Sequence, residues 1–171
     1  MFTDPSKFLQ RLGYEAGFAG ELDAGIMTLR LLLAGLLGAL VGAEREWRNR
    51  VFGLRTHCLV SIGSATFCMT VVSLIDSFDD ESTIQMDPGR IVEGIIGGIG
   101  FLGAGAIIHG DRDVRGATTG AGIWVVGGIG VAVGFGYYLH ATLLTVVILF
   151  VLSVLRRLSA WLEKAGRERD H

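Results

Sequence analysis

The side chains best suited to chemistry lie at the ends of apolar segments and do not form a catalytic pattern. Two carboxylates flank an arginine in Glu44-Arg45-Glu46, and another arginine precedes a threonine pair at a later apolar segment. At the mouth of a membrane span, carboxylates beside arginines can form a polar lock or an ion-sensing site. The alternative is a solvated basic collar that only fixes topology, to which Arg48 and Arg50 are assigned. The predicted set comprises Glu44, Arg45, Glu46, Arg55, Thr56, His57, Arg90, Arg115, Thr118 and Thr119.

Glu93 is the candidate metal ligand. Asp87-Pro88 is typical of a helix N-cap followed by proline at the first helical position, which places Glu93 roughly 7 Å further along the helix. A carboxylate at that depth is a functional hypothesis, and Mg²⁺ prefers oxygen ligands. The alternative is a structural ion pair with Arg90, three positions earlier. An acidic loop precedes this helix. A solvated loop is the favoured interpretation, and weak attraction of Mg²⁺ is the alternative. The loop residues are Asp76, Asp79, Asp80, Glu81 and Asp87.

Other sites are not indicated. Residues 98–103 read G-x-G-x-x-G, but the motif lies inside an apolar segment with no carboxylate about 20 positions later, so we expect no dinucleotide. Neither a Ser/His/Asp set nor an H-E-x-x-H motif is present, and we expect no enzyme activity and no bound cofactor other than possible Mg²⁺. Cys58 and Cys68 read as buried thiols.

Composition places these residues in a membrane protein. The 171 residues carry a net charge of −2, which does not favour nucleic-acid binding. Half of the residues are hydrophobic, 19% are charged, and the mean hydropathy is +0.51. The pattern predicts an all-α polytopic bundle of about five spans in residues 26–155, between an outer-side segment 1–25 and a basic tail 156–171. The spans are expected near Ile26–Ala43, Thr56–Ile75, Ile91–Ile108, Ala117–Gly134 and Leu139–Leu155.

Glycines at four-residue spacing are expected to pack these helices. Small residues let backbones approach closely where lipid supplies no hydrophobic drive. The predicted packing positions are Gly38, Gly42, Gly94, Gly97, Gly98, Gly100, Gly103, Gly116, Gly120, Gly130 and Gly134.

The basic residues give an orientation. With five spans, eleven of the fifteen Lys and Arg residues fall on one side, after the first, third and fifth spans. The positive-inside rule then predicts the N-terminus outside and the C-terminus in the cytoplasm.

Several long motifs in order resemble the MgtC/SapB family of bacterial membrane proteins. They are Gly42-Ala43-Glu44-Arg45-Glu46, Gly53-Leu54-Arg55-Thr56-His57, residues 98–107, and Val114-Arg115-Gly116-Ala117-Thr118-Thr119-Gly120-Ala121, followed by Trp124. The resemblance implies a five-span inner-membrane protein associated with Mg²⁺ homeostasis and low-magnesium adaptation. It also implies regulation of other membrane proteins, such as the ATP synthase or cation-transport systems. Many members add a cytoplasmic ACT-like domain, and we expect this chain to be a short form without it.

The leading hypothesis is a regulatory protein that acts by helix contact with a second copy or with another membrane protein. Abundant glycine and sparse ion-pathway chemistry motivate it. The alternative is a transporter of Mg²⁺ or another cation that uses Glu93 and the polar inner mouth.

Overall fold

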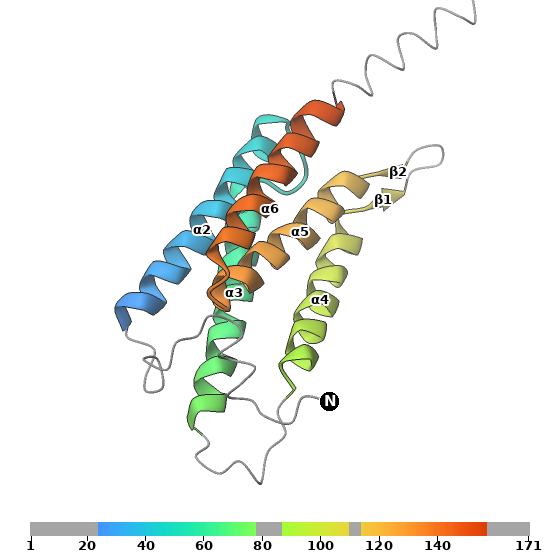
Figure 1. Cartoon of the computed structure of the whole chain (residues 1–171). Coiled ribbons are helices and arrows are strands. Elements are labelled where there is room, and N and C mark those ends of the chain that lie inside the picture. The colour runs from blue at the N-terminus through green and yellow to red at the C-terminus, as the bar shows by residue number, and fades with distance from the viewer. Residues whose placement is uncertain (1–23, 78–86, 110–113, 157–171) are drawn as a thin grey trace, which may run out of the picture.

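The structure is a computed structural model that describes residues 24–77, 87–109 and 114–156. These residues form a bundle of five long helices (Figure 1). The helices are α2 (Ala24–Trp47), α3 (Leu54–Ser77), α4 (Pro88–Gly105), α5 (Ala117–Gly134) and α6 (Tyr138–Phe150), and α6 continues as a π-helical turn, η1 (Val151–Leu155). The prediction of an all-α bundle of about five helices is confirmed. The predicted segments 1–25 and 156–171 lie almost entirely outside the described residues, and the domain boundaries stay a prediction.

Four helices are long and apolar enough to cross a membrane: α2, α3 as far as Leu74, α5, and α6 with η1. The fifth, α4, has 18 residues and carries Arg90 and Glu93 in its first two turns. Its beginning matches the prediction, because Asp87 is the N-cap, its carboxylate accepts a hydrogen bond from the Gly89 N–H at 2.8 Å, and Pro88 follows it.

Successive helices alternate in direction, so the start of α2 and the end of α6 lie at opposite ends of the bundle (Figure 1). One end, called here the hairpin end, carries the α2–α3 connection, the α4–α5 connection and the end of α6. The other end carries the short α5–α6 turn, where Gly136 has φ +84°. This turn separates α5 from α6, as the five-span prediction requires. Which end faces the cytoplasm stays a prediction.

A small antiparallel ladder joins α4 to α5. Strand β1 (Ile108–His109) pairs with β2 (Val114–Arg115). The predicted third span was wrong in ending at Ile108, because α4 ends at Gly105 and the chain then reverses. At Gly116, φ is +90° and an added Cβ would collide with the carbonyl oxygen of Ala106, so this position requires glycine. Gly116 is therefore the N-cap of α5 and not an interior packing residue.

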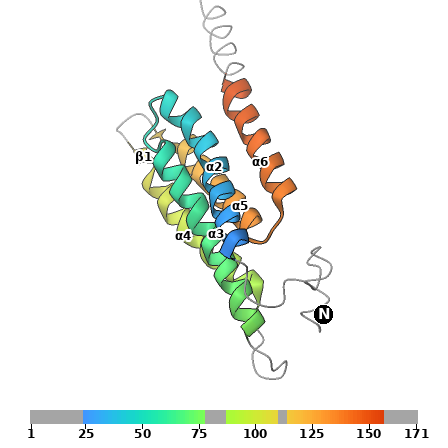
Figure 2. The ribbon, with the colours of Figure 1, turned by 90° about the vertical axis from the view of Figure 1, so that its left-hand side faces the viewer.

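Helix α5 lies at the centre of the bundle and contacts α2, α3, α4 and α6 (Figures 1 and 2). Its glycines form the crossings. An added Cβ at Gly120 would lie 2.7 Å from the Gly103 carbonyl oxygen of α4, and one at Gly134 would lie 2.7 Å from the Ala65 carbonyl oxygen of α3. Gly130 approaches Ser61 in the same way. Helices α2 and α3 meet similarly at Gly38 and Gly42. The apolar core between them includes Val41, Val126, Ile129 and Val133.

Four predicted packing glycines of α4 have no neighbour in the described chain. Nothing lies within 4 Å of a Cβ added at Gly94, Gly97, Gly98 or Gly100, and all four are exposed. The opposite face of α4, with Ile95, Ile99 and Gly103, packs inward. Among the described residues, no close helix neighbour meets these four positions, because α4 lies at the edge of the described bundle, and their packing role stays a prediction. The four residues are called here the α4 glycine face.

Candidate functional site

A buried polar cluster lies where α2 ends and α3 begins, at the hairpin end. Its core members, Arg45, His57 and Ser61, are at most 3% exposed. Charged and polar groups at such positions need partners, because their removal from water is costly. The stability of the cluster therefore depends on the ion pairs and hydrogen bonds that its own residues form.

Glu44 is the anion of this cluster. Its Oε2 accepts from the Nε of Arg45 at 2.6 Å and forms an ion pair with Nη2 at 2.5 Å. Its Oε1 lies 3.4 Å from the Nε of Arg48, one helical turn later. Glu44 is only 12% exposed, so the two arginines balance its charge in a partly dry environment. Glu44 thus pairs with two arginines of its own helix end, and the predicted lock with Arg55 and Arg115 stays a prediction.

Glu46 performs a different task at the start of α3. Its Oε2 accepts the backbone N–H of Leu54 at 2.8 Å, which satisfies a donor that the first helical turn leaves open. The carboxylate also packs against Gly53, where an added Cβ would lie 2.7 Å from Oε2. An anion at a helix N-terminus is favourable for the helix dipole. Glu46 therefore ties the end of α2 to the beginning of α3.

His57 brings α5 into the cluster. Its Nδ1 lies 2.9 Å from the Gly53 carbonyl oxygen, and since a carbonyl can only accept, Nδ1 carries the hydrogen. The other ring nitrogen, Nε2, lies 3.7 Å from the position of an added Cβ at Gly122 of α5. Nε2, the Ser61 hydroxyl and the Glu44 Oε1 are buried and form no hydrogen bond with the described residues. The cluster therefore contains three buried polar atoms that are still able to form hydrogen bonds, and one of them lies beside α5.

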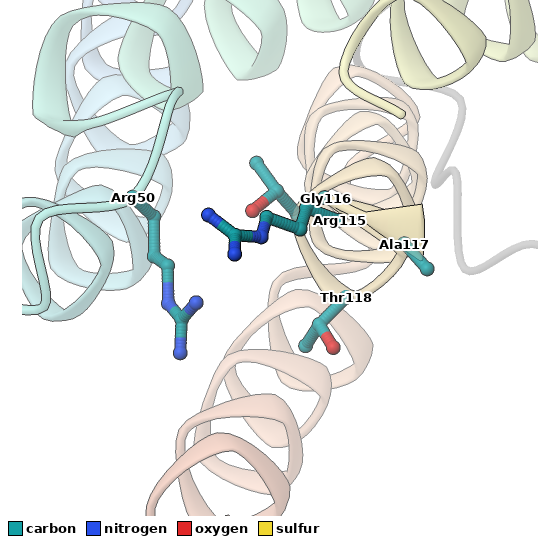
Figure 3. A pocket seen from close by; sticks show the side chains of 6 residues that line it. Arg50, Arg115, Gly116, Ala117 and Thr118 are labelled. Carbon is teal, nitrogen blue, oxygen red and sulfur yellow. The ribbon is translucent and has the colours of Figure 1, made fainter. Parts of the chain in front are cut away.

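A cavity of about 410 Å³ opens beside the start of α5 (Figure 3). Arg50 of the α2–α3 connection lines it, together with Arg115 and the segment 116–119. Figure 3 shows the Arg115 guanidinium directed toward the connection from which Arg50 extends. Thr118 is exposed, whereas Thr119 is 2% exposed. The polar side chains at the hairpin end thus form two groups, a buried cluster on α2 and α3 and a basic cavity at the start of α5.

The remaining predicted residues lie outside both parts. Arg55 is exposed and Thr56 is half-buried on the first turn of α3. Arg90 and Glu93 are exposed on α4, near the end opposite the hairpin end, and they form no ion pair with each other. In the described ranges, no three His, Cys, Asp or Glu side chains are grouped as metal ligands. The geometry therefore does not bring Glu93 to the polar mouth.

Comparison with known proteins assigns the chain to a family. The MgtC family profile matches residues 31–161, more than half of the chain. The chain belongs to the MgtC family. Protein MgtC of Salmonella typhimurium is 47% identical over 128 residues, which cover 75% of this chain and 52% of that protein. Protein MgtC of Brucella abortus is 44% identical over 139 residues, or 80% of this chain and 55% of that protein.

Further comparison adds one relative and no solved structure. An uncharacterized protein of Haemophilus influenzae is 33% identical over 149 residues, covering 86% of this chain and 63% of that protein. The chain thus spans about half to two thirds of the length of these relatives. No solved structure matches it significantly. The MgtC family match includes the buried cluster and the basic cavity.

Sequence reasoning missed four polar residues of this MgtC family chain. Arg48 and Arg50 were assigned to a solvated collar, but one pairs with Glu44 and the other lines the cavity. Ser61 gave no signal beyond its position in an apolar run. Arg30 did give one, because an arginine inside such a run needs a polar partner.

Arg30 joins α2 to the α5–α6 turn, at the end opposite the cavity. It is 5% exposed, donates from Nη1 to the Gly134 carbonyl oxygen at 2.9 Å, and donates from Nε to the Tyr138 hydroxyl at 3.0 Å. A cation at the last carbonyls of α5 is favourable for that helix's dipole. In the MgtC family chain, Arg30 therefore stabilises the turn that reverses the chain between α5 and α6.

Proposed function

We propose that this MgtC family chain is a non-enzymatic, multi-pass protein of the bacterial inner membrane. It supports magnesium homeostasis and adaptation to low magnesium by regulating other membrane proteins through helix contacts. Family membership supports the physiological setting. The observation that carries the mode of action is the α4 glycine face, which no other helix of the described chain covers.

The energetics of glycine support a contact role for this face. Each glycine in a helix interior costs about 0.5–1 kcal/mol relative to alanine. At Gly120 and Gly130 close packing between helices offsets that cost, but at the α4 glycine face no described residue packs closely enough to do so. In a bilayer, glycines at four-residue spacing let a second helix approach closely. A transmembrane helix of another chain is therefore the occupant that suits this face.

The polar cluster supports regulation more than transport. Glu44 is engaged by Arg45 and Arg48, and Glu46 caps α3, so these carboxylates serve helix positions. Cation transport through Glu93 remains the alternative, with the exposed position of Glu93 on α4 as its basis. Mg²⁺ flux in reconstituted liposomes that is lost with Glu93→Gln would favour it. Absent or unchanged flux would exclude this route.

The proposal is tested by substituting the α4 glycine face in cells grown at low magnesium. We expect Gly97→Leu to abolish both complementation and the recovery of a crosslinked membrane partner in mild detergent. The matched control is Gly63→Leu, because a Cβ at Gly63 of α3 also meets nothing within 4 Å. If the Gly97 variant keeps the phenotype and the partner, or if both variants lose them equally, the contact role of α4 is wrong.

A further inference from the structure

The basic cavity at the start of α5 has the composition of an anion site. We infer that it binds a phosphate group, either in the headgroup of an anionic phospholipid or in a soluble phosphate. The observations that carry this inference are the open first turn of α5, two arginines on opposite sides of the cavity, and a threonine whose hydroxyl is reachable from the cavity and has no hydrogen-bond partner among the described residues. The inference is independent of the proposed role of α4, since it concerns other residues.

The first turn of α5 presents unsatisfied donors to the cavity. Helix α5 has 18 residues, and its N-cap, Gly116, has no side chain to accept from the backbone N–H groups that follow. The first N–H groups of a helix have no acceptor within it, and together with the helix dipole they favour an anion. Residues 116–119 all line the cavity, so these donors surround one space.

Two guanidinium groups add charge to the same space. Arg50 and Arg115 line the cavity, and no described acidic residue does. Arg48 is already paired with Glu44, whereas Arg50 forms no ion pair with any described residue. The planar fork of arginine matches the spacing of phosphate oxygens and can bind two of them at once. The charge of the site is therefore suited to an oxyanion more than to a cation.

Thr119 is the independent indication of a ligand. Its side chain lines the cavity and is 2% exposed, and no hydrogen bond joins its hydroxyl to another residue that the structure describes. The hydroxyl is not one of the fully buried polar atoms, so it is reachable from the cavity, where a ligand can supply the partner that the described residues do not. A phosphate oxygen in the cavity would accept from this hydroxyl.

Cavity size and position suit a phosphate that carries an organic group. The volume of about 410 Å³ lies within the range of small-ligand pockets, about 300–1,000 Å³. The cavity lies at the hairpin end, where α2 and α6 end and α3 and α5 begin. If these helices cross the bilayer, that level is close to the lipid headgroups. A phospholipid headgroup and a soluble phosphate can both reach it.

The test uses the purified full chain in two arms. In detergent free of phosphate, inorganic phosphate and glycerol 3-phosphate are titrated at constant ionic strength, with chloride as the comparison anion. In mixed-lipid nanodiscs, native mass spectrometry compares retention of phosphatidylglycerol with that of phosphatidylcholine. Saturable binding in the first arm identifies a soluble phosphate. Selective retention only in the second identifies a headgroup, and either result supports the site.

Variants separate the site from general positive charge. We expect Arg50→Ala to weaken binding about tenfold or more, because it removes a charge-assisted hydrogen bond. Thr119→Val should also weaken it, and Thr119→Ser, which keeps the hydroxyl, should not. The matched control is Arg55→Ala, since Arg55 is exposed at the same end but does not line the cavity. No binding in either arm, or equal loss with the Arg50 and Arg55 variants, would overturn the inference.

Discussion

The crossing of α3 and α5 at Gly130 gives the sharpest test of the packing. An added Cβ there would collide with the carbonyl oxygen of Ser61 and would lie 2.8 Å from the Cβ of Ser64. Ordinary van der Waals contact begins at 3.4 Å, so the second atom alone is about 0.6 Å too close. The first atom is backbone, which cannot move without separating the two helices. Gly130→Ala must therefore force α3 away from α5.

The expected loss follows from two opposing terms. Overpacking costs about 1–3 kcal/mol, while replacing a helical glycine by alanine gains about 0.5–1 kcal/mol. We expect Gly130→Ala to lower the free energy of unfolding by about 1–2 kcal/mol. Gly63→Ala of α3 is the matched control: nothing lies within 4 Å of its added Cβ and it lies outside the α4 glycine face, so only the favourable term applies. That variant should be neutral or more stable.

The assay is reversible unfolding in mixed micelles, followed by circular dichroism, with both variants at equal protein concentration. The opposite sign of the two effects is the decisive feature, because any general effect of alanine on helix stability acts on both. If Gly130→Ala is as stable as Gly63→Ala, the close approach of α3 and α5 is refuted.

Three further predictions concern the polar groups. Arg30→Ala should lower the free energy of unfolding by about 1.5–3 kcal/mol, since hydrogen bonds from a buried charge are lost; an unchanged unfolding curve would contradict it. Glu44→Gln should lower the free energy of unfolding by about 3–5 kcal/mol, because it leaves Arg45 buried without its anion. A second change, Arg45→Met, should restore much of that stability. No recovery in the double variant would count against the ion pair. Glu46→Ala should cost about 0.5–2 kcal/mol and speed hydrogen exchange at the Leu54 amide, whereas unchanged exchange there would show that Glu46 does not cap α3.

Helix positions were predictable because each apolar run is bounded by charge, proline or glycine. The end of α4 was not, since Ile107 and Ile108 continue the apolar pattern after the helix has stopped. The reversal there depends on Gly116 at positive φ beside Ala106, a contact between residues that hydropathy cannot relate.

Glycine spacing predicted where helices can approach closely, but not which of these positions another helix actually meets. The pairs at 94 and 98 and at 130 and 134 have the same spacing, yet among the described helices only the second pair meets a neighbour. The difference arises because α5 is central and α4 lies at the edge, which is a property of the whole bundle. In the same way, the sequence placed arginines at the span ends, but only the folded chain brings Arg50 to the first turn of α5.

The central claim is that the α4 glycine face contacts a helix of another chain. Photo-crosslinking residues placed singly at Phe101 of α4, which is 80% exposed, and at Leu36 of α2, which is 58% exposed, test it most directly in cells at low magnesium. We predict a discrete protein adduct from position 101 and none from position 36, with its mass showing whether the partner is a second copy or a different protein. No adduct from position 101, or equal adducts from both positions, would contradict the claim.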